Sequence, residues 1–187
     1  MKTLKKLSIS LVAITALAIG TLNAQNKTVM VGGAEMYPTK NIIQNAMNSK
    51  DHTTLVAAVK AAGLVETLEG TGPFTVFAPT NEAFAKLPAG TVDNLLKPEN
   101  KATLTAILTY HVVAGKIDSK MIMQKIKEGN GKATMTTVQG GILTFTMKGK
   151  NLMLTDEKGN MAMVTIKDVY QSNGVIHVID TVMMPKA

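Results

Sequence analysis

The sequence predicts an α+β domain, because helix-like patterns fill its first part and strand-like patterns its last part. Apolar residues recur every three or four positions in "PTKNIIQNAMNS" and in "TTLVAAVKAAG", as on one face of a helix. From residue 132 the period changes to two, as in "ILTFTMK", which is typical of strands. Helices segregated from strands favour an α+β domain over alternating βαβ units. The length of 187 residues, 45% of them hydrophobic, suits one domain.

The start of the chain, residues 1–24, predicts a secretory signal peptide. Three lysines within the first six residues precede an apolar run from Leu7 to Ile19, and Ala24 offers a small residue for cleavage. The run is short for a membrane span, and no second apolar run of spanning length follows. We therefore expect a secreted protein, periplasmic or extracellular, with residues 25–39 as an N-terminal extension and residues 40–187 as the folded domain.

The helical half divides into short amphipathic helices. The first has Thr39 as its expected cap, and the second ends at Gly63. A longer helix is expected to begin near Pro98, where proline suits a first helical turn. It leads into a short strand over residues 110–115.

The stretch "TVFAPTNEAF" predicts a buried strand followed by a capped helix. The apolar run from Phe74 to Ala78 reads as the strand, and Pro79 ends it. Thr80 can accept the first free N–H groups of a helix that carries Phe84 and Leu87 on one face. Every residue of this stretch therefore has a structural role.

The strand half reads as a meander. Turn sequences occur at residues 140–141, 148–151 and 157–160, and strand patterns follow in "MAMVTIKDV" and "GVIHVID".

Composition excludes several classes of function. The chain has no cysteine, so it has no disulfide, thiolate nucleophile or thiolate metal site. Its 20 basic residues are all lysine, so it lacks the arginine side chains that bind phosphates and bases through two hydrogen bonds. Tryptophan is absent and aromatic residues make up 4% of the chain, which disfavours stacking on nucleic-acid bases. The formal charge of +7 includes three lysines of the signal peptide. The remaining lysines are scattered along the sequence, as on an ordinary solvated surface.

No enzyme motif stands out. The sequence has no Gly-x-Ser-x-Gly elbow, no His-Glu-x-x-His and no phosphate-binding glycine loop. The three histidines, His52, His111 and His177, lie far apart in the sequence. We therefore expect no catalytic residues, no cofactor and no enzymatic activity.

Three separated motifs carry a resemblance to a known family. "TVFAPTNEAF" at 75–84, "YHVVAG" at 110–115 and "NGVIHVIDTVMMP" at 173–185 resemble, in order and separation, the first conserved box, the Tyr-His motif and the second conserved box of a fasciclin-like domain of the fasciclin and beta-Ig-H3 family. With "TTLVAAVKAAGL" at 53–64, the resemblance covers roughly residues 40–185. One such domain after a signal peptide is similar to the single-domain bacterial members.

The resemblance implies a fold and a function. The fold is a wedge of two β-sheets flanked by several short α-helices. The function is adhesion at cell surfaces or in the extracellular matrix, without a general catalytic activity. We therefore expect a monomeric or weakly associating domain whose surface binds a protein or a polysaccharide of a cell surface, matrix or envelope.

The Tyr-His motif is the first candidate contact region. In eukaryotic relatives it is implicated in integrin binding, which by resemblance selects Tyr110 and His111 with the flanking Leu108 and Val112. The alternative is that His111 is a neutral imidazole that holds backbone groups together where the helix meets the strand.

A second candidate contact lies just before the second box. Asp168 and Val169 stand where matrix relatives carry an acidic-aliphatic integrin motif. The alternative is the solvated end of a strand.

Three polar residues of the boxes are expected to be structural. Asp180 lies among apolar residues, and a buried carboxylate needs a donor. We expect that donor to be Thr80, Asn81 or His111, so that Asp180 braces the two boxes.

The rival function is soft-metal binding in the periplasm. The chain has 13 methionines, and thioethers select Cu(I). Met161 and Met163 are two residues apart on an expected strand and share a face, whereas Met121 and Met123 diverge on a helix. A third ligand is not evident from sequence, and methionine as a filler of the core is the alternative.

Overall fold

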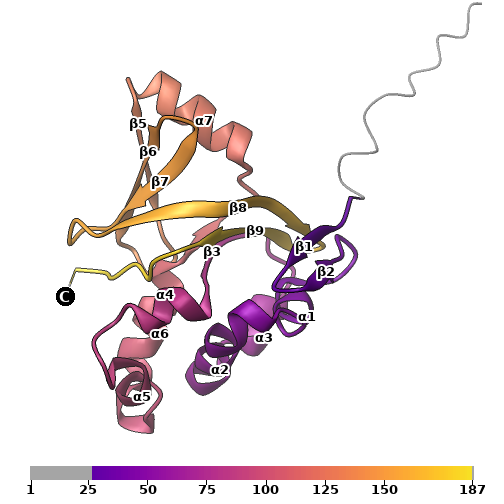
Figure 1. The fold of residues 1–187 in the computed structure, drawn as a ribbon, viewed down its shortest axis with the longest axis vertical. Coiled ribbons are helices and arrows are strands. Elements are labelled where there is room, and N and C mark those ends of the chain that lie inside the picture. Colours follow the sequence, from indigo (N-terminus) through magenta and orange to yellow (C-terminus); the bar gives the residue numbers. More distant parts are fainter. Residues whose placement is uncertain (1–26, 187) are drawn as a thin grey trace, which may run out of the picture.

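The computed structural model describes residues 27–186 (Figure 1). The expected signal peptide, residues 1–24, lies outside the described residues. Helices α1 to α6 gather on one side of strands β3 and β9, and α7 lies at the other end of the molecule against β5, β6 and β7 (Figure 1). The expected α+β architecture is confirmed.

Seven strands form the main sheet, in the order β4-β3-β9-β8-β7-β6-β5. They are β3 (Phe74–Pro79), β4 (Val112–Ala114), β5 (Lys132–Thr136), β6 (Ile142–Lys148), β7 (Asn151–Thr155), β8 (Met161–Gln171) and β9 (Gly174–Ile179). The pair β3 and β9 is parallel, and the other neighbours are antiparallel. A separate two-stranded hairpin consists of β1 (Val29–Val31) and β2 (Ala34–Met36).

Strand β8 joins the two halves of the wedge. It pairs with β7 at its start and with β9 further along, and its register with β9 shifts twice between Val164 and Val169. Such irregularities bend a strand and increase its twist. The sheet therefore turns at β8, so that its two halves pack against different helices.

Residues 27–186 form seven α-helices, six on one side of β3 and β9 and one against β5 to β7. They are α1 (Ile42–Ala46), α2 (Thr53–Ala62), α3 (Val65–Glu69), α4 (Asn81–Ala85), α5 (Thr91–Leu95), α6 (Lys101–Tyr110) and α7 (Ser119–Glu128). Short 3-10 turns at Lys50–His52 and Pro98–Asn100 precede α2 and α6.

The helix ends follow the expected capping chemistry with two corrections. Thr80 caps α4, accepting a hydrogen bond from the Ala83 N–H at 3.2 Å, and Gly63 ends α2 with φ +73°. The cap of α1 is Asn41 rather than Thr39, because Asn41 and Gln44 exchange side-chain bonds with each other's N–H. Tyr110 is the last residue of α6, so the following strand begins at Val112 and not at residue 110.

The core has two layers separated by the central strands. One cluster lies between β3 and β9 and helices α1 to α6, and it includes Val76 and Val178. The other lies between the sheet and α7, and it includes Phe77 and Ile179. Strands β3 and β9 therefore alternate between two buried faces, which explains why both read as nearly continuous apolar runs.

The expected N-terminal extension contributes to the first cluster. Val31 of β1 is 4% exposed and Met36 of β2 is 3% exposed. The hairpin therefore packs as part of the domain rather than beside it.

Asn173, at the turn between β8 and β9, connects three elements. Its side-chain oxygen accepts from the Ile42 N–H at 3.0 Å, and its amide donates to the carbonyls of Leu68 at 2.8 Å and Gly70 at 2.9 Å. The next residue must be glycine, because a Cβ on Gly174 would lie 2.1 Å from the Phe74 carbonyl oxygen. This turn therefore fixes α1 and α3 against the start of β9.

We predict that Asn173→Ala destabilises the domain by about 2 kcal/mol or more, because it leaves buried backbone groups without partners. Asn48→Ala, a control on an exposed amide, is expected to change the free energy of unfolding by less than about 0.5 kcal/mol. Urea unfolding monitored by circular dichroism measures both. Equal stability of the two variants would contradict the role of Asn173.

Candidate functional site

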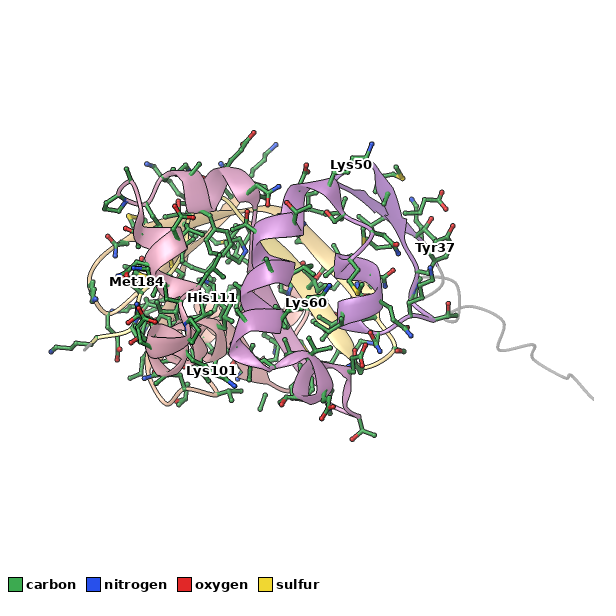
Figure 2. All side chains as sticks on the ribbon, turned by 90° about the horizontal axis from the view of Figure 1, so that it is seen from below. Tyr37, Lys50, Lys60, Lys101, His111 and Met184 are labelled. Atoms are coloured by element: carbon green, nitrogen blue, oxygen red, sulfur yellow. The ribbon has the colours of Figure 1, made fainter. Side chains whose placement is uncertain are left out.

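The Tyr-His pair lies where α6 ends, before β4, and joins that junction to other parts of the fold. The Tyr110 hydroxyl donates to the Ile142 carbonyl at 2.8 Å and accepts from the Glu157 N–H at 3.2 Å. Burial raises the pKa of Tyr110 to about 12. His111 lies among the packed side chains, away from the rim where Tyr37 and Lys50 lie (Figure 2).

His111 is a neutral connector. Its Nδ1 lies 2.8 Å from the Ile107 carbonyl and therefore donates, and its Nε2 accepts from the Met183 N–H at 3.0 Å. Burial lowers the pKa of His111 to about 4, and the Ile107 bond opposes that shift only in part. Both ring nitrogens are thus occupied by backbone groups.

The expected contact residues of this region are interior. Leu108, Tyr110, His111 and Val112 are each no more than 6% exposed. In this structure they hold the α6–β4 junction and do not present a surface to a partner. The physical reason is that the end of α6 inserts between both apolar clusters.

Asp168 and Val169 have different environments. Val169 is 1% exposed and belongs to the first apolar cluster, so it is no contact surface. Asp168 is half-buried with φ +61° in the irregular part of β8. Its carboxylate accepts from the Ser119 N–H at 2.6 Å and from the Ser119 hydroxyl. Asp168 thus holds the start of α7 against β8 and is not a free strand end.

His177 supports this arrangement from β9. Its Nε2 donates to the Ile117 carbonyl at 3.0 Å, and its Nδ1 accepts from the Asp168 N–H at 3.3 Å. Burial lowers the pKa of His177, which keeps the ring neutral. His177 is therefore a second buried imidazole that connects backbone segments.

The expected donors to Asp180 are wrong. Its carboxylate accepts from the Met163 N–H at 2.8 Å and the Thr181 hydroxyl at 3.1 Å. Lys86 lies 3.8 Å away, and the Asp180 side chain is 35% exposed. Because it follows the end of β9, beside β8, its carboxylate meets β8 and its own neighbour instead of Thr80, Asn81 or His111.

Asn81 braces a different pair of elements. It accepts from the Thr54 N–H at 3.0 Å and donates to the Lys50 carbonyl at 2.8 Å, which ties α4 to the start of α2. Thr80 caps α4. Both side chains make internal hydrogen bonds, and neither contacts Asp180.

His52 lines a small apolar cavity between the helices and the sheet. The cavity has a volume of about 50 Å³ and is bounded by residues such as Ile42, Val59 and Val76. The His52 Nδ1 pairs with the Ser49 hydroxyl at 2.8 Å, while Nε2 has no hydrogen bond of ordinary geometry. Burial lowers the pKa of His52, and the Ala78 carbonyl opposes that shift. The cavity is smaller than the roughly 150 Å³ apolar cavities that bind benzene, so we interpret it as unfilled core.

The outer face of β5 to β8, opposite α7, carries threonine and methionine. We call it the outer face; it comprises Lys132, Thr134, Thr136, Ile142, Thr144, Thr146, Lys148, Asn151, Met153, Thr155, Met161 and Met163. Met161 is 51% exposed and Ile142 is 45% exposed. Met153 stands directly opposite Met163 in the register of β7 and β8. The structure thus adds a third methionine beside the pair that the sequence selects.

A surface cleft of about 210 Å³ opens on the opposite side of the same strands, under α7. We call it the α7 cleft. Its apolar side chains are Met123, Met147, Leu152 and Val164. Its polar side chains are Ser119, Lys150, Asn151, Thr165 and Lys167.

The part of the chain around the α7 cleft is basic. Residues 116–150 contain seven lysines and two acidic residues. Lys120, Lys125 and Lys127 lie on α7, and Lys148 and Lys150 lie at the β6–β7 turn. The uneven charge of this segment is the signal by which sequence reasoning could have found the cleft.

Within residues 27–186, no three histidine or acidic side chains gather as a metal-binding group. No helix in the same range is long and apolar enough to cross a membrane. His111 and His177 have both ring nitrogens hydrogen-bonded to backbone groups. His52 and His111 border the small apolar cavity, and His177 does not.

Comparison with protein families identifies the class of protein. The fasciclin domain model matches residues 50–185, and the chain belongs to this family.

One relative from Synechocystis sp. and two from Mycobacterium bovis are similar over most of the chain. It is 43% identical over 192 aligned residues to protein sll1483 of Synechocystis sp., covering 99% of both chains. It is 42% identical over 147 residues to the immunogenic protein MPB70 of Mycobacterium bovis, covering 76% of this chain and 67% of that protein. Over the same share of this chain it is 40% identical to the cell surface glycolipoprotein MPB83 of Mycobacterium bovis, of which it covers 59%.

A solved structure shares the fold. A FAS1 domain pair from the insect cell adhesion molecule fasciclin I matches with a TM-score of 0.67 and 18% identity over 78% of this chain. The chain spans about half of that pair, 51% of its length.

We predict that acid destabilises the domain through His111. The folded pKa of about 4 lies below the ordinary value of 6.5, so below pH 6.5 the unfolded chain binds the proton more tightly. Titration of His111 therefore leaves the free energy of unfolding unchanged above pH 6.5 and lowers it by about 3 kcal/mol as the pH drops to about 4.

Urea unfolding at pH 7.5 and pH 4.5 measures this loss in the wild type and in His111→Gln. The loss of stability is expected to be smaller in the variant, because it lacks the His111 imidazole. The other titrating groups are the same in both proteins. An identical loss in both proteins would show that His111 does not carry it.

Proposed function

We propose that this protein is a secreted, non-enzymatic adhesion domain that binds a protein or polysaccharide of a cell surface, matrix or envelope. The observation that carries the proposal is the use of the motif residues. Internal hydrogen bonds engage the polar side-chain atoms of Tyr110, His111, Asp168 and His177. We therefore infer that other, exposed residues bind the partner.

Two surfaces are available for a partner. The outer face offers exposed methionine, isoleucine and threonine side chains, and the α7 cleft offers lysines beside apolar side chains. Exposed apolar residues and concave sites with a few polar groups are typical of interaction surfaces.

Named relatives support a location outside the cytoplasm and a role in adhesion. One is named a cell surface glycolipoprotein, and the related solved structure comes from a cell adhesion molecule. We infer by analogy that the present chain is exported and acts as a monomer on an extracellular or envelope partner.

A binding assay with the purified exported protein tests the proposal. We expect saturable binding to whole cells or to a panel of glycans, unchanged by Cu(I) under reducing conditions. Leu108→Met, a conservative change in the interior, should keep this binding. A lack of saturable binding to every cell and glycan would reject the adhesion function, and loss in a folded Leu108→Met would return the Tyr-His region to the interface.

Cu(I) binding is the second candidate function. The observation that favours it is the register that sets Met153 opposite Met163, with Met161 two residues along the same face. Directly opposite Cβ atoms lie about 5 Å apart, so three thioethers can converge on one soft ion.

Replacing Met153, Met161 and Met163 by leucine together tests this candidate. If copper is the function, the wild type takes one Cu(I) from a chelating dye and the triple variant takes none. A matched triple, Met30→Leu with Met47→Leu and Met121→Leu, changes exposed methionines on three other elements and should bind like the wild type. Equal uptake by all three proteins, or none by the wild type, would reject the site.

A further inference from the structure

We propose that the α7 cleft binds one carboxylate-bearing sugar unit of an acidic polysaccharide. This inference rests on the proposed adhesion function and names the chemistry of its partner. The shape of the cleft, its charge and its mixture of apolar and polar side chains support this ligand.

The cleft has two walls from different parts of the fold. Helix α7 contributes Ser119 and Met123, which are four residues apart and therefore lie on one face of the helix. The sheet contributes the β6–β7 turn, with Lys150 and Asn151, and the middle of β8. Asp168 fixes the distance between these walls, because it binds both the N–H and the hydroxyl of Ser119.

The charge of the cleft selects an anion. Lys150 and Lys167 lie in its lining, which contains no acidic side chain. In the described part of the chain neither lysine has a carboxylate within 4.0 Å, and the ion pair found there is between Lys86 and Asp180. The surrounding excess of lysine raises the local concentration of an anionic ligand and steers its approach.

The remaining lining suits a sugar ring. Met123, Met147, Leu152 and Val164 offer apolar contact for the C–H face of a ring. The Asn151 amide makes no hydrogen bond to residues 27–186 and can both donate and accept. The Thr165 hydroxyl donates to the Val178 carbonyl at 3.3 Å, and its oxygen still accepts.

Size argues for one unit of a chain. The volume of about 210 Å³ is below the roughly 300 Å³ at which pockets for drug-sized ligands begin. A nucleic acid is disfavoured because the lining has neither arginine nor an aromatic side chain for stacking.

Titration calorimetry with oligogalacturonate as the probe tests the proposal. Its methyl-esterified form has the same rings without the charge, and polyglutamate has carboxylates without sugar rings. We expect saturable binding of oligogalacturonate at low salt and at least tenfold weaker binding of both other probes.

Two double variants locate the site. Lys150→Gln with Lys167→Gln should weaken oligogalacturonate binding about tenfold or more. Lys60→Gln with Lys101→Gln removes the same charge from α2 and α6, on the helical side of the molecule (Figure 2), and should leave binding nearly unchanged. All four lysines are exposed, so we expect both variants to fold.

Each outcome has a defined meaning. Equal weakening by both double variants, or equal binding of polyglutamate, would overturn the cleft as a sugar site. Adhesion to cells that survives Lys150→Gln with Lys167→Gln would also overturn it, while the adhesion function stands. Absence of adhesion in the wild type would reject both proposals.

Discussion

The parallel pairing of β3 with β9 is the interaction on which the rest of the structure depends. It joins residues 74–79 to residues 174–179, two segments separated by most of the domain. Because both strands are buried on both faces, each supplies side chains to two apolar clusters at once. Hydrophobic burial is roughly proportional to the apolar area removed from water. The pair thus stabilises the helical layer and the α7 layer together.

Buried polar side chains connect the segments that this pairing brings together. His111 links α6 to the C-terminal segment, His177 links β9 to β8 and to Ile117 in the loop before α7, and Asn173 links a turn to two helices. A buried polar group is costly when it lacks a partner, so each of these residues favours one arrangement of its neighbours. Neutral imidazoles serve this role because one nitrogen donates while the other accepts.

This use of polar residues places most of the polar atoms of the family motifs inside the fold. The Tyr-His motif is interior, whereas Ile142, Met161, Lys150 and Lys167 are exposed on or beside the β5–β8 half of the sheet. Asp168 lies in the sheet but also shapes the surface. Its left-handed backbone and its hydrogen bonds to Ser119 position one wall of the α7 cleft. A scaffold of this kind can keep its core while its surface side chains change with the partner.

The sequence by itself determined the α+β class, the buried strand at Phe74, the Thr80 cap and the stop at Gly63, because these depend on local periodicity and capping. It also selected the motifs of a fasciclin-like domain. Only the tertiary structure decided the partners of Asp180, the burial of Val169, the position of Met153 opposite Met163 and the gathering of Lys150 and Lys167 in one cleft. Those features depend on strand register and on packing between distant segments, which local patterns do not encode.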